Sequence, residues 1–135
     1  MNVKTFIQKA LSKDSPPAYV KATSLLACPN LARILHGITG ISSEGGELLS
    51  MLKAHLMYGR PLDKINIVEE CGDILWFMTI LLGSIDSNIE EAMQVNCEKL
   101  SVRYPQGFSE SCANNRNVEK ERTIIERNMG HIDDK

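Results

Sequence analysis

The sequence predicts an all-α fold, a helical bundle with a four-helix core and a short C-terminal helical arm. Apolar residues recur at steps of three and four residues, as on one face of a helix. The alternating pattern of β-strands is missing, and aromatic residues make up only 5% of the chain. A chain of 135 residues that is 43% hydrophobic has the size of one globular domain. We therefore expect a single domain over residues 1–135, with its core at about 18–105 and the arm at about 106–128.

The first two helices of the core follow a polar segment at Ser12–Pro17. The first is expected near Ala18–Ala27. The second is the long one, which Pro29 opens because proline suits the first turn of a helix, and which ends at the glycine and proline of Tyr58–Pro61. Gly45 costs about 1 kcal/mol relative to alanine in a helix interior. Because the apolar stripe keeps its phase on both sides of that glycine, we expect the helix to be continuous.

The third and fourth helices complete the core. The third runs from about Leu62 to Ser84 and is apolar on every side over Ile74–Leu82, the pattern of a helix enclosed at the centre of a bundle. The fourth begins with a capping box formed by Ser87 and Glu90 and ends at Tyr104–Pro105.

The arm begins with polar residues. The segment Gln106–Asn117 is expected to be a loop, and Val118–Arg127 a short charged helix. We expect this arm to pack on the core.

Charge and composition exclude several classes of function. The net charge of −2 and the pI of about 5.9 show no basic excess for a long nucleic acid. The longest apolar run, Ile74–Leu82, is too short to span a bilayer, and the N-terminus lacks the apolar region of a signal peptide. The four cysteines are irregularly spaced, as free thiols are, rather than in pairs of zinc ligands. We expect a cytoplasmic protein with no membrane partner.

Two pairs of acidic residues, Glu44 with Glu47 and Glu70 with Asp73, are the main candidates for a functional site. Each pair has a spacing of three residues, so its two side chains share one face of a helix. The turn between the helices lies about 16 Å from the first pair and about 14 Å from the second at 1.5 Å per residue. A short turn makes the helices antiparallel neighbours. The two pairs are therefore expected to lie almost level.

Four carboxylates gathered beside apolar residues repel each other and lose hydration unless a cation neutralises them. Oxygen ligands without cysteine or histidine suit Mg²⁺, with Mn²⁺ as a substitute. A single ExxE pair is usually a solvated face of a helix, but two level pairs favour a site. A ferritin-like di-iron centre would need Glu-x-x-His, which is absent from the sequence. The expected metal-binding and catalytic residues are Glu44, Glu47, Glu70 and Asp73.

Three polar residues of the fourth helix, Asn96, Lys99 and Arg103, share a face with its apolar stripe. Lys99 and Arg103 are placed to complement the helix dipole, but their alignment with the stripe favours binding of an anion. An arginine can make two contacts with one phosphate. Neither a P-loop nor a GxGxxG motif is present. Phosphates would therefore be held by a metal and side chains.

Four segments of the chain resemble the MazG family: residues 35–37, 43–48, 70–77 and 96–105. The last is followed by Gln106, Gly107 and Phe108, which completes a segment similar to KLxxRYPxGF. The resemblance covers roughly residues 30–122. The combination of ExxE, ExxD and this basic segment at these distances is specific, whereas a single ExxE is not.

The resemblance implies hydrolysis of nucleoside triphosphates, with deoxyribonucleotides favoured, to the monophosphate and pyrophosphate by a homodimer or homotetramer. It implies a role in clearing unwanted nucleotides from the pool. Carried over by position, Mg²⁺ would be held by Glu44, Glu47, Glu70 and Asp73. The substrate would be contacted by Asn96, Lys99, Arg103 and Tyr104. The family's fullest motif has a further glutamate where this chain has Ser43, which leaves the number of metals and the general base open.

Two alternatives remain on the sequence alone. One is a non-catalytic helical module with an acidic, cation-binding face. The other is a narrower relative that acts only on dUTP or on phosphoribosyl-ATP.

Overall fold

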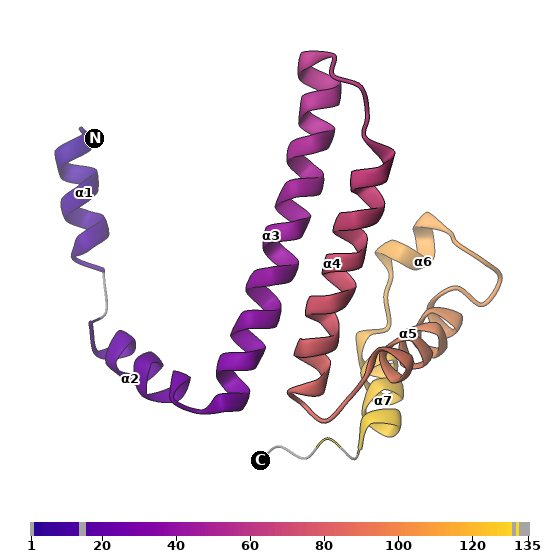
Figure 1. Cartoon of the computed structure of the whole chain (residues 1–135). Helices are drawn as coiled ribbons and strands as arrows, with labels where there is room; N and C mark the ends of the chain where they lie inside the picture. Colours follow the sequence, from indigo (N-terminus) through magenta and orange to yellow (C-terminus); the bar gives the residue numbers. More distant parts are fainter. Residues whose placement is uncertain (1, 14–15, 131, 133–135) are drawn as a thin grey trace. The chain divides into compact units, whose positions relative to one another are not determined.

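The computed structural model describes all residues except 1, 14–15, 131 and 133–135, and the described part contains seven helices and no strand (Figure 1). The all-α fold class is therefore confirmed. The helices are α1 (Val3–Leu11), α2 (Pro16–Leu26), α3 (Pro29–Tyr58), α4 (Lys64–Gly83), α5 (Ile89–Arg103), α6 (Glu110–Asn114) and α7 (Val118–Met129).

The chain forms two compact units, Met1–Ala32 and Arg33–Lys135. The first contains α1, which the sequence reading did not predict, and α2, which begins two residues earlier than expected. Helix α1 starts where the side chain of Asn2 accepts a hydrogen bond of 2.8 Å from the backbone N–H of Thr5. That the whole chain is one domain stays a prediction.

Helix α3 is one unbroken helix of 30 residues, and the prediction that Gly45 does not interrupt it is confirmed. Two other glycines of α3, Gly37 and Gly40, are buried where α4 packs against it. A Cβ atom on Gly40 would lie 2.2 Å from the ring of Phe77, and one on Gly37 would lie 2.8 Å from the Cβ atom of Leu81. Glycine at these positions therefore lets the two helices approach closely, at the cost of helix propensity.

Helix α4 runs back antiparallel to α3, as Figure 1 shows. Its N-cap is Asp63, whose carboxylate accepts hydrogen bonds from the backbone N–H groups of Ile65 and Asn66. The prediction that α4 is enclosed on every side is wrong for the single chain. Leu75 is 50% exposed and Trp76 is 68% exposed, so the described helices of the unit that contains α4 leave this side of it uncovered.

Helix α5 starts one residue later than predicted, and the capping box of Ser87 and Glu90 is wrong. The N-cap is Asn88, whose side chain accepts a 3.0 Å hydrogen bond from the backbone N–H of Glu91. The Ser87 hydroxyl instead donates to the side chain of Glu91 at 2.8 Å. Asn and Ser are equally good N-caps, so residue type could not decide between them.

The arm contains two helices rather than one. Within the segment predicted to be a loop, Ser109 caps the five-residue helix α6, which is too short to show a helical period in the sequence. Helix α7 begins at Val118, as predicted, and packs against α5.

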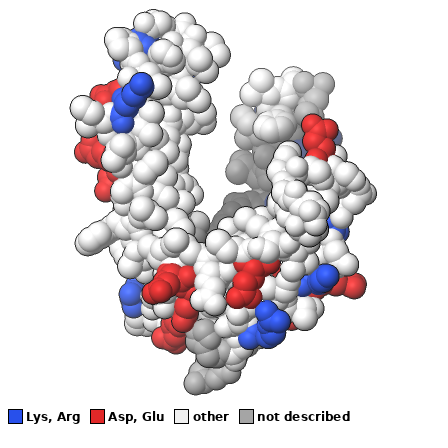
Figure 2. Space-filling model, turned by 90° about the vertical axis from the view of Figure 1, so that its right-hand side faces the viewer, with Lys and Arg blue, Asp and Glu red and all other residues white. Residues whose placement is uncertain are grey.

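The surface carries no extended patch of one charge on the face drawn in Figure 2, where acidic and basic side chains lie near each other between uncharged areas. No helix in the described part of the chain has both the length and the hydropathy needed to cross a membrane.

Candidate functional site

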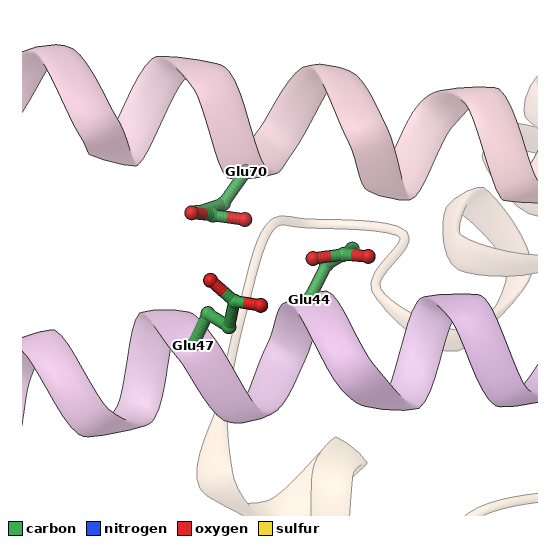
Figure 3. Close-up of side chains that lie close together, drawn as sticks. All are labelled: Glu44, Glu47 and Glu70. Atoms are coloured by element: carbon green, nitrogen blue, oxygen red, sulfur yellow. The ribbon is translucent and has the colours of Figure 1, made fainter.

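Three of the four predicted metal-binding carboxylates converge between α3 and α4. One side-chain oxygen each from Glu44, Glu47 and Glu70 lies within 4.8 Å of the other two (Figure 3). Glu70 is buried, Glu44 is half-buried and Glu47 is exposed. The site is therefore open to solvent on the side of Glu47 and closed on the side of α4.

The position of this cluster follows from the hairpin. Glu44 and Glu47 lie one turn apart on α3, and the chain turns back at Gly59, whose φ of 65° is readily adopted by glycine. Helix α4 then brings Glu70 opposite them, as predicted from their similar distances to the turn. Asp73 lies one turn further along α4, is exposed and is not part of the group of three. Its role as a metal ligand stays a prediction.

Burial and the neighbouring carboxylates both disfavour the charged form of Glu44. Its pKa is raised from the usual value of 4.5, first by burial and then by the negative charges of Glu47, Glu70 and Asp73. A divalent cation at this point would reverse the effect, since it would stabilise the ionised carboxylates.

Asn66 is a member of the site that the sequence reading missed. Its side-chain amide donates a hydrogen bond of 2.6 Å to Oε1 of Glu70. Asn66 lies one turn before Glu70 on α4, so the spacing of four residues was the available signal. Hydrogen bonds of this kind orient carboxylate ligands around a metal.

The donor set fits a hard divalent cation. It consists of carboxylate oxygens with no nitrogen or sulfur ligand, which suits Mg²⁺ or Mn²⁺. Metal–oxygen bonds of about 2.1 Å place opposite ligands about 4.2 Å apart. Adjacent ligands of such an ion lie only about 3.0 Å apart, so the oxygens of Glu44, Glu47 and Glu70, which lie within 4.8 Å of one another, would have to move closer together to bind one ion.

Asn96 and Lys99, two of the predicted substrate-binding residues, line a cavity of about 640 Å³. The cavity lies between α5, α7 and the C-terminal end of α4, and most of its lining is apolar. Neither side chain has a hydrogen-bond or ion-pair partner within the part of the chain that the structure describes. Both are therefore available to a ligand in this cavity.

Arg103 lies elsewhere. Its guanidinium donates two hydrogen bonds to Glu121 of α7, from Nε at 2.8 Å and from a terminal nitrogen at 2.5 Å. Arg116 donates a third hydrogen bond to the same carboxylate, at 2.7 Å. Hydrogen bonds from Arg103 first, and then from Arg116, lower the pKa of Glu121 to about 2. Arg103 borders a separate, smaller cavity of about 190 Å³ with Arg116 and Lys120.

Tyr104 ends α5, and its ring centroid lies 5.5 Å from that of Phe108. It does not line the cavity that contains Asn96 and Lys99. The structure thus places the predicted substrate-binding residues in more than one location, and their contacts with a substrate stay predictions. Glu121, the partner of Arg103, is a second residue that the sequence did not single out.

Comparison with known proteins gives one clear relationship. Searches of curated proteins and of solved structures gave no match. A family model for the MazG nucleotide pyrophosphohydrolase domain matches residues 35–108, more than half of the 135-residue chain. The matched segment contains the carboxylate cluster, Asn66 and all of α5. From this match and the helical fold, the chain belongs to the MazG nucleotide pyrophosphohydrolase family.

Proposed function

We propose that this protein hydrolyses nucleoside triphosphates, with deoxyribonucleotides as its main substrates, to the monophosphate and pyrophosphate in a Mg²⁺-dependent reaction. The observation that carries the proposal is the convergence of Glu44, Glu47 and Glu70 from two helices, in a chain that belongs to a nucleotide pyrophosphohydrolase family. By analogy, the reaction would remove unwanted nucleotides from the cellular pool.

In the proposed mechanism, Glu44, Glu47 and Glu70 hold the cation together with Asp73. When bound there, Mg²⁺ supplies neutralisation of phosphate charge and activation of water. Asn66 keeps the Glu70 carboxylate in place through its 2.6 Å hydrogen bond. One of the two glutamates of α3 accepts the proton of the attacking water.

The nucleoside end of the substrate is assigned to the cavity lined by Asn96 and Lys99. Its volume of about 640 Å³ lies in the range of small-molecule pockets, about 300–1,000 Å³. Lys99 supplies positive charge beside apolar walls, while Arg122 is paired with Glu126, which also lines the cavity. A cation beside apolar walls suits a nucleotide. Leu82, at the cavity, follows Glu70 by 12 residues, about 18 Å along the helix. The carboxylates and the cavity that serve one substrate can therefore belong to two copies of the chain.

Self-association is part of the proposal, because α3 and α4 expose apolar residues at heptad spacing. Leu49, Leu52 and Leu56 continue on α3 the series of Leu35 and Ile38, and all five are exposed. Ile65, Val68 and Leu75 follow the same spacing on α4. Exposed heptad stripes of this kind pack against other helices. A homodimer or homotetramer would cover them.

A panel of ribo- and deoxyribonucleoside triphosphates, including dUTP, together with phosphoribosyl-ATP, tests the proposed reaction. The purified protein is incubated with each compound and Mg²⁺, and pyrophosphate and orthophosphate are measured separately. We expect pyrophosphate without orthophosphate, and no product in EDTA. Turnover of only dUTP or only phosphoribosyl-ATP would show a narrower enzyme. No product from any compound would refute the enzymatic proposal and leave a cation-binding module.

A further inference from the structure

Helix α7 lies outside residues 35–108, which match the family model, yet it forms a wall of the larger cavity. Arg122, Ile125 and Met129 of α7 line this cavity opposite Val95 and Lys99 of α5. The shape of the cavity therefore depends on how firmly α7 is held against α5.

The buried contact that holds α7 is Glu121. Glu121 is only 4% exposed, and its carboxylate accepts two hydrogen bonds from Arg103 and one from Arg116. A buried carboxylate is costly unless it is paired, and the two-contact geometry with arginine is specific in direction as well as strong. Because Arg103 is the last residue of α5, this pairing ties the beginning of α7 to the end of α5.

A second ion pair between these helices, among the described residues, is more exposed. Arg127 of α7 contacts Glu98 of α5 at 3.2 Å, with the two side chains 71% and 35% exposed. Exposed pairs of this kind contribute little to stability, since solvent screens them and long side chains lose freedom. Asn128 of α7 also donates a hydrogen bond of 2.9 Å to Glu98. The orientation of α7 therefore depends on apolar packing, on this contact near its end and, near its beginning, on the pairing of Glu121 with Arg103.

We infer that Glu121 is a positioning residue for nucleotide binding, which holds α7 through Arg103 so that α7 closes the cavity lined by Asn96 and Lys99. In this arrangement Arg103 does not touch the phosphates, because its guanidinium is occupied by Glu121. The inference rests on the proposed function for its ligand class, a nucleotide. The anchoring of α7 is independent of that function.

The test compares Arg103→Ala, Glu121→Ala and the double variant in steady-state hydrolysis. Each single variant should raise KM roughly 10- to 100-fold and leave kcat within about twofold, as expected when a binding wall is displaced but the reacting groups are intact. The double variant should raise KM no more than Glu121→Ala, because Glu121→Ala already removes the contact with Arg103. Hydrogen exchange should show a loss of protection of the α7 amides in all three variants, and a smaller loss in Arg103→Ala, which leaves the hydrogen bond from Arg116 to Glu121 in place.

Two further variants keep the test informative if the alanine variants fold poorly. Arg116→Ala removes one of the three hydrogen bonds and should raise KM by less than Arg103→Ala. Glu119→Ala, on the same turn of α7 but exposed, is the matched control and should leave KM and the exchange of α7 unchanged.

The outcomes separate the inference from the proposed function. An increase in KM for Arg103→Ala with a normal KM for Glu121→Ala would overturn the inference, because it would mean that Arg103 acts directly on the substrate. Additive effects in the double variant would also overturn it. An inactive wild-type protein would instead refute the proposed function, and with it the nucleotide as ligand. Hydrogen exchange would then still decide whether Glu121 holds α7.

Discussion

The α3–α4 hairpin and the α5–α7 pair are stabilised in different ways. The hairpin meets along a half-buried inner stripe, with Gly37 and Gly40 allowing close approach, and its outer faces expose large apolar side chains. The α5–α7 pair encloses Val95, the one hydrophobic side chain classed as buried among the described residues, and the buried carboxylate of Glu121.

This difference indicates which region of the molecule would gain from contact with another chain. The α5–α7 pair satisfies its buried charge within one chain, since Glu121 finds both of its arginine partners there. The hairpin leaves apolar area in water, which costs about 25 cal/mol for each Å². It also carries the carboxylates. The proposed catalytic region is therefore the one that the proposed self-association would stabilise.

The largest expected effect is on catalysis, from Glu70→Ala. We expect the loss of about 1,000-fold or more in kcat/KM, since several kcal/mol of transition-state stabilisation depend on the cation and each 1.36 kcal/mol is a factor of ten. The control is Glu69→Ala, which removes an adjacent exposed carboxylate. Pyrophosphate release measures both. Normal activity of Glu70→Ala would exclude the cluster as the metal site.

The proposed self-association should be broken by Leu49→Glu, on the exposed stripe of α3. Leu49 is 67% exposed in the single chain, so a charge there should leave the fold intact and raise the dissociation constant about 30-fold or more, as for a central interface residue. Sedimentation and the emission of Trp76, the only tryptophan, report association. Ser50→Glu, which adds the same charge on the polar side of α3, should associate normally. A wild-type protein that is monomeric at all concentrations would contradict this prediction.

Asn66→Ala should weaken the metal site without removing a ligand. Loss of its hydrogen bond to Glu70 should lower the affinity for Mn²⁺ roughly 10- to 100-fold, the usual effect of losing a partner of a metal ligand. Calorimetric titration with Mn²⁺ measures it, and Gln94→Ala, which alters an exposed amide of α5, serves as the control. Equal affinities in the two variants would show that Asn66 has no part in the site.

Gly40→Ala tests the packing of the hairpin. The added methyl group would overlap the ring of Phe77, and overpacking of this kind destabilises by about 1–3 kcal/mol. Gly46→Ala, with no atom within 4 Å of its added methyl group, should instead stabilise α3 by about 1 kcal/mol. Urea unfolding of both variants gives the comparison, and changes of the same sign would contradict it.

The last prediction concerns the stability of α7 in acid, and it expects no change at neutral pH. The pKa of Glu121 is about 2 in the folded protein and about 4.5 without its partners. Its pairing therefore stabilises the fold fully above pH 4.5, and this contribution is lost as the pH falls from 4.5 toward 2. Hydrogen exchange of α7 should show this loss in the wild type and a flatter profile in Glu121→Gln. Identical profiles would mean that the ion pair does not govern α7.

The α3–α4 region was largely predictable from the sequence. Helical periodicity and the glycine and proline after Tyr58 predict two antiparallel helices, and equal distances from their turn place Glu44 and Glu47 beside Glu70. These are local rules, which act over a few residues. They failed for the N-cap of α5, where Ser87 and Asn88 are chemically equivalent, and for α6, which is too short to show a period.

The α5–α7 region was not predictable in the same way. Arg103 and Glu121 are 18 residues apart, and no helical period relates them. The sequence favoured an anion-binding role for Arg103 because its spacing aligns it with Asn96 and Lys99. The structure pairs Arg103 with the carboxylate of Glu121, which only the return of α7 brings near, and a contact of Arg103 with substrate stays a prediction.

By itself the sequence determined the helices α2–α5 and α7, the family resemblance and the nearness of Glu44 and Glu47 to Glu70. Helix geometry and short turns convert spacing along the chain into position. The tertiary structure alone decided that Asp73 lies outside the group of three, that Arg103 pairs with Glu121, and that α7 walls the cavity of Lys99. Such features depend on contacts between distant segments, and packing and the pairing of buried charge select those contacts.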